Sequence, residues 1–103
     1  MEEQPFISQD VIARYAGDAA LEVNGVVALA DGGLHRGKGV DVGDDARELV
    51  VRVHVELEWG RNAAEVGQEV QRRVSEYLER MADRKPASVD VVVDAVGSPP
   101  AKR

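Results

Sequence analysis

The segment ELVVRVHVELEWG, residues 48–60, carries the clearest secondary-structure signal of the chain. Apolar side chains occupy every second position, which is the period of a β-strand with one buried face. The predicted core face consists of Leu49, Val51, Val53, Val55, Leu57 and Trp59. The opposite face consists of Glu48, Val50, Arg52, His54, Glu56 and Glu58. A long half-buried strand of this kind is typical of an antiparallel or mixed sheet.

An amphipathic helix is predicted from Gln9 to Val23, upstream of this strand. Ser8 is expected to cap its N-terminus, and Asp10 places an acid in the first turn, where the helix dipole favours one. Asn24-Gly25 follows directly, and glycine tolerates the left-handed backbone that ends many helices. Apolar side chains recur with helical spacing at Val11, Ile12, Ala16, Ala19, Ala20 and Val23.

A second helix is predicted after the turn at Gly60-Arg61. Asn62 is its expected N-cap, and Glu65, three residues later, completes a capping-box pattern. The apolar stripe of this helix consists of Val66, Val70, Val74, Tyr77, Leu78 and Met81. Two ion pairs at i, i+4 spacing are expected on its solvent side, Glu69 with Arg73 and Glu76 with Arg80.

Three further segments are predicted as strands: Val26–Ala30, a short strand at Val40–Val42, and Val89–Val96. The pattern predicts an α+β fold, a two-layer sandwich with both helices on one face of a small mixed or antiparallel sheet of three to four strands. One domain is expected over residues 6–96, with a disordered tail over residues 97–103. The aromatic side chains predicted to pack in the core are Tyr15, Trp59 and Tyr77.

The composition excludes several classes of function. The chain has 103 residues, of which 44% are hydrophobic and 31% charged, so it has the composition of a small globular protein. A net charge of −6 opposes nucleic-acid binding. The absence of cysteine excludes thiolate chemistry and cysteine-held metals. No secretory signal or membrane span is evident, which predicts a cytoplasmic protein without direct membrane insertion.

The glycine-rich segment 31–47 contains a partial phosphate-loop pattern. Gly32, Gly37 and Lys38 fit the G-x-x-x-x-G-K spacing, but Gly39 occupies the position of the Ser or Thr that would hold magnesium. The sequence that follows predicts a strand and a turn where the motif requires a helix. The residues that remain as a candidate anion-contact loop are His35, Arg36 and Lys38.

His54, Glu56 and Glu58 share one predicted strand face and raise the alternative of a metal site. Same-face neighbours on a strand lie about 7 Å apart, so one ion would need a further ligand from another strand, such as Asp90 or Asp94. A solvated or interface-lining face is the preferred interpretation. No catalytic arrangement is evident, so we expect a non-enzymatic protein without a cofactor.

The sequence resembles the alkaline shock protein 23 family of bacterial envelope stress-response proteins over nearly its whole length. The family pattern E-V-x-G-V occurs at residues 22–26, an aromatic-Gly pair closes the long strand at Trp59-Gly60, and V-Q-x-x-V occurs at residues 70–74. One departure is the turn after the second helix, where the family usually has a Thr-Gly pair and this chain has ADRKP, residues 82–86.

This resemblance implies a non-enzymatic bacterial stress-response protein that acts in envelope homeostasis. It implies self-association, or a membrane-anchored partner that recruits the protein to the inner face of the cell membrane. The open face of the sheet, opposite the helices, is the predicted interface, with Val50, Arg52, His54, Glu56, Val92 and Val96. The alternative is a regulatory domain that binds a small ligand, anion or metal through the glycine loop or the His54 face.

Overall fold

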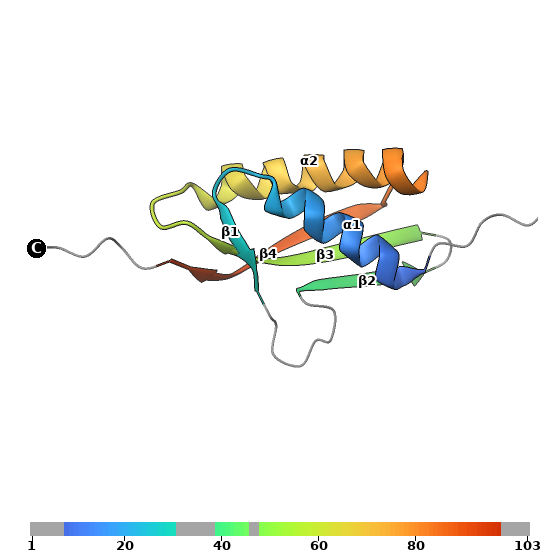
Figure 1. Ribbon diagram of the computed structural model, residues 1–103, viewed down its shortest axis with the longest axis horizontal. Helices are drawn as coiled ribbons and strands as arrows, with labels where there is room; N and C mark the ends of the chain where they lie inside the picture. Colours follow the sequence, from blue (N-terminus) through green and yellow to red (C-terminus); the bar gives the residue numbers. More distant parts are fainter. Residues whose placement is uncertain (1–7, 31–38, 46–47, 98–103) are drawn as a thin grey trace, which may run out of the picture.

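The structure of the protein is a computed structural model that describes residues 8–30, 39–45 and 48–97. The elements follow in the order α1 (Gln9–Leu21), β1 (Val26–Leu29), β2 (Val40–Asp45), β3 (Glu48–Leu57), α2 (Ala63–Ala82) and β4 (Ser88–Val96). Both helices lie on one face of the sheet (Figure 1). The predicted fold class, an α+β sandwich of two helices on a small sheet, is confirmed.

Strand β3 is the centre of a mixed sheet. On one edge, β4 runs parallel to β3, from Val50↔Ser88 to Leu57↔Val96, with α2 as the crossover between them. On the other edge, β1 and β2 both run antiparallel to β3 and follow each other end to end: β1 pairs with residues 55–57 and β2 with residues 48–53. Between them, the His54 carbonyl accepts from the Ala30 N–H at 2.8 Å.

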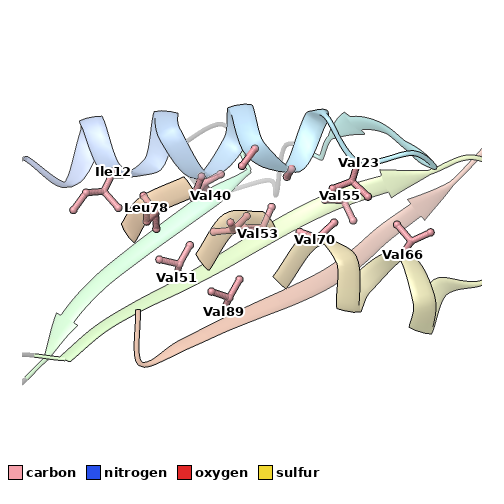
Figure 2. Packing of buried hydrophobic residues seen from close by; sticks show 14 of the residues in the cluster. Ile12, Val23, Val40, Val51, Val53, Val55, Val66, Val70, Leu78 and Val89 are labelled. Atoms are coloured by element: carbon pink, nitrogen blue, oxygen red, sulfur yellow. The ribbon is translucent and has the colours of Figure 1, made fainter. Parts of the chain in front are cut away.

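The alternation in β3 is confirmed up to the last strand residue. Leu49, Val51, Val53, Val55 and Leu57 are all at most 2% exposed. Figure 2 shows the core between this strand face and the two helices. Most core-facing side chains of α1 are alanines, and the helix residues in the core are Ile12, Ala16, Ala19, Ala20, Val66, Val70, Val74 and Leu78. Apolar burial over this surface is the main stabilising term of the fold.

The helix ends follow the predicted capping with small differences. The Ser8 hydroxyl accepts from the Val11 N–H at 3.3 Å, and the Asn62 side chain accepts from the Glu65 N–H at 3.0 Å. Helix α1 ends at Leu21, two residues before the predicted end. Helix α2 ends with Asp83 in the left-handed region, at φ 56°, so an aspartate adopts a conformation that glycine usually takes.

Two predictions about the core are wrong. Trp59 is 52% exposed, because β3 ends at Leu57 and the chain turns before the alternation reaches residue 59. Met81 is 45% exposed, because Ala82 takes the next core position one turn after Leu78. Tyr15 and Tyr77 are half-buried against the core, as predicted, and their rings meet edge to face with centroids 5.8 Å apart.

Ion pairs cover the solvent face of α2 in an arrangement that differs partly from the prediction. Glu69 accepts from Arg73 at 3.2 Å, as expected, and also from Arg72 at 2.6 Å. Glu76 pairs with Arg72 at 3.1 Å rather than with Arg80, which lies over the Tyr77 ring. The hydrogen bond from Arg72 lowers the pKa of Glu69, and the same bond raises the pKa of Arg72.

Acidification is expected to remove the contribution of Glu69 to stability. Its pKa is lower in the folded than in the unfolded chain, so the contribution is complete above the unfolded pKa and is lost as the pH falls through the folded pKa. The variant Glu69→Gln should therefore lose less stability than the wild type when the pH is lowered from about 6 to about 3. Urea unfolding at several pH values measures this difference, and identical pH profiles would contradict it.

Candidate interaction face of the sheet

The uncovered face of the sheet is built from alternate residues of β2, β3 and β4. Since β3 turns its odd-numbered side chains toward the helices, Val50, Arg52, His54 and Glu56 point to the opposite side. Paired residues in a sheet share a face, so Val92 joins them through its pairing with His54. In the described part of the chain, no helix packs on this side (Figure 1). We call it the open face.

Val96 does not belong to the open face. The β3–β4 register shifts between Val55 and Glu56, and beyond the shift Val96 pairs with Leu57, whose side chain faces the core. This bulge turns Val96 toward the helix side of the sheet, where it is 55% exposed. Gly97, the first residue of the predicted tail, still donates its N–H to the Leu57 carbonyl at 2.8 Å. The rest of that tail lies outside the described residues.

His54 is at the centre of the open face and is held by a carboxylate on each side. Its Nδ1 lies 3.0 Å from the Asp94 carboxylate on β4, and its Nε2 lies 3.3 Å from the Asp41 carboxylate on β2. The imidazole is 11% exposed, although no helix of the described residues packs on this side of the sheet. The three side chains therefore connect three strands across the open face.

The sheet register explains how the two aspartates reach His54. The His54 N–H donates to the Gly39 carbonyl at 2.7 Å, so Asp41, two residues further along β2, lies beside it on the same face. Asp94 is the extra residue of the β4 bulge, between the pairs Val55↔Val93 and Glu56↔Ala95. Bulges often redirect a side chain in this way. Sequence reasoning considered Asp94 only as a metal ligand and missed Asp41, because registers are not visible in a single sequence.

The geometry does not favour the alternative of a metal site on this face. Asp41 and Asp94 contact opposite nitrogens of the imidazole, so the ring stands between them. Glu58 is engaged with Arg61 at 3.0 Å. Among the residues that the structure describes, no group of three or more histidine, aspartate or glutamate side chains is arranged to hold a metal ion.

A further ion pair on the open face joins β3 to β4. Arg52 and Asp90 pair at 3.7 Å with both side chains about half exposed, a geometry that contributes little to stability. Val50 and Val92 are half-buried and lie among these charges. The predicted anion-contact residues His35, Arg36 and Lys38 lie outside the described residues.

The comparisons with known proteins agree with this architecture. The sequence model of a protein family with a cell envelope-related function matches residues 2–98. The chain belongs to the alkaline shock protein 23 family. The family assignment thus confirms the resemblance seen in the sequence. No match was found among curated proteins.

Solved structures of the MamM CTD share the fold of this alkaline shock protein 23 family member. A nickel form of one MamM CTD variant has a TM-score of 0.62 at 16% identity, covering 84% of this chain and 98% of that chain. A copper form of another variant has a TM-score of 0.62 at 15% identity, covering 85% and 98%. At such identities the likeness concerns the fold alone.

Neither helix in the described ranges is long and apolar enough to cross a membrane.

Proposed function

We propose that this alkaline shock protein 23 family member is a non-enzymatic interaction module for cell-envelope homeostasis. It acts in the cytoplasm by binding a second copy of itself, or a membrane-anchored partner that recruits it to the inner face of the membrane. The observation that carries the proposal is the open face, which has half-buried valines set among charges and no helix over it in the described residues. Non-obligate interfaces are about as apolar as the rest of a protein surface, so valines among charges are compatible with such an interface.

The valines of the open face are the residues to test. The variants Val50→Asp and Val92→Asp are expected to weaken association by at least about tenfold, because a buried, unpaired carboxylate opposes the interface. Analytical ultracentrifugation measures self-association, and a crosslinked pull-down from membrane and soluble fractions measures partner recovery. Circular dichroism should show that both variants remain folded.

A matched substitution on the helix side separates the open face from apolar surface in general. Met81 is exposed on α2, so Met81→Asp introduces the same charge away from the proposed interface. Its association and its partner profile should equal those of the wild type. If Val50→Asp and Val92→Asp also leave mass and partners unchanged, the open face is not the interface and the proposal fails.

A further inference from the structure

Among the described residues, the imidazole of His54 contacts the carboxylates of Asp94 and Asp41, and a neutral ring cannot donate a hydrogen bond to both. A neutral imidazole has one N–H and one lone pair, whereas the protonated ring donates from both nitrogens. With both carboxylates ionised, the contacts at 3.0 Å to Asp94 and 3.3 Å to Asp41 are therefore both hydrogen bonds only when the ring carries its second proton. In the neutral ring, one carboxylate faces a lone pair.

We infer that protonation of His54 sets the arrangement of the open face through its contacts with Asp41 and Asp94. We call these three side chains the latch. With the proton bound, the ring donates to Asp41 on β2 and to Asp94 on β4, so the latch joins the strands on both sides of β3. When the proton leaves, one of these contacts changes from attraction to repulsion, and that carboxylate moves away from the ring. Histidine is suited to this role because its charge changes between about pH 5 and pH 8.

Because of the bulge in β4, the contact of His54 with Asp94 should affect the backbone more than its contact with Asp41 does. Asp94 is the residue that β3 leaves without a register partner, so its side-chain contact with His54 supports a locally irregular backbone. The Asp41 side is part of a regular antiparallel pairing between Val40 and Asp45. Loss of the proton should therefore change the backbone around Asp94 more than the backbone around Asp41.

Charges around the latch determine what deprotonation does to the surface. The described charged groups that face the ring, or border it on the same side of the sheet, are Asp41 on β2, Arg52 and Glu56 on β3, and Asp90 and Asp94 on β4. Acids outnumber bases among them, so the proton on His54 offsets part of a negative field. In so far as the proposed self-association holds, protonation reduces repulsion between two open faces and strengthens their contact.

Nuclear magnetic resonance of the full chain tests the latch directly. Ring ¹⁵N shifts of His54 are followed between about pH 5 and pH 8, together with the backbone amides of residues 41, 92 and 94. We expect the amides of residues 41 and 94 to shift with the same midpoint as the ring. Since the chain has only two histidines, His35→Gln leaves His54 as the sole titrating imidazole and should preserve the coupled shifts.

Two substitutions of latch residues should abolish the coupled amide shifts, one at both strands and the other at residue 94 alone. His54→Gln keeps a donor and an acceptor but does not titrate in this range, so the coupled amide shifts should disappear. Asp94→Asn keeps the shape of the side chain, and should remove the coupling at residue 94 while leaving it at residue 41. A His54 ring that titrates without moving either amide, or amide shifts that persist in His54→Gln, would overturn the inference.

Self-association, measured on the same variants at two pH values, distinguishes the latch from the proposed function. Self-association of the wild type should be at least about fivefold tighter at pH 5.5 than at pH 8, and that ratio should vanish in His54→Gln. Association that depends on Val50 but is equal at both pH values would exclude control by the latch and retain the proposed interface. Coupled amide shifts without any association at the open face would retain the latch and exclude the interface.

Discussion

The variant Gly39→Ala is expected to lower the free energy of unfolding by about 3 kcal/mol or more. Gly39 has φ 91°, a region that side chains with a Cβ rarely adopt. An added Cβ would lie 2.5 Å from the Ala30 carbonyl oxygen and 3.0 Å from the Leu29 Cβ. Leu29 is the last residue of β1, and the Ala30 N–H donates to the His54 carbonyl at 2.8 Å, so neither atom can rotate away. The backbone of β2 would have to move from the place where Gly39 accepts the hydrogen bond from His54.

Urea unfolding followed by circular dichroism measures this loss. The control is Gly67→Ala in α2, where an added Cβ meets no atom within 4 Å outside the helix backbone. Since alanine favours helices, that variant should be more stable than the wild type by about 0.5 to 1 kcal/mol. A Gly39→Ala protein as stable as the wild type would show that β1 and β2 do not meet at His54 as described.

Local periodicity predicted the layers of this fold because one long strand dominates the sequence. The alternation from Leu49 to Leu57 separates the core face from the open face, and all five predicted core positions of this stretch are buried in the structure. The caps at Ser8 and Asn62 were also predictable, because a capping side chain bonds to backbone only a few residues away. The alternation and the caps both depend on residues that are close together in the sequence.

The arrangement of the strands could not be predicted in the same way. Two strands, β1 and β2, share one edge of β3, and the chain leaves and rejoins that edge beside His54. Register is set by pairing between distant segments, and a single sequence does not reveal it. The contacts of His54 with Asp41 and Asp94 span 13 and 40 residues, so they follow from this pairing alone.

Periodic patterns also fail where an element ends. Trp59 continues the alternation of β3 in the sequence, but the Glu58 N–H already donates to the Gly25 carbonyl and the chain turns toward α2. For Val96, the β4 bulge changes the face within a single strand. Met81 has an apolar side chain at the margin of the stripe of α2, and only the position of the sheet beneath decides between Met81 and Ala82.

The two large apolar side chains in the last turns of α2 should therefore differ strongly in their contribution to stability. Leu78 is 0% exposed and Met81 is 45% exposed. Leu78→Ala is expected to cost about 3 kcal/mol, because it removes buried methyl groups and leaves a cavity, whereas Met81→Ala should cost less than about 1 kcal/mol. Leucine and methionine are both good helix formers, and both are replaced by alanine. The change in helix propensity is therefore nearly the same in the two variants. Urea unfolding of the two variants measures the difference. Equal losses would mean that α2 is rotated about its axis relative to the sheet, and the core face of this helix would have to be reassigned.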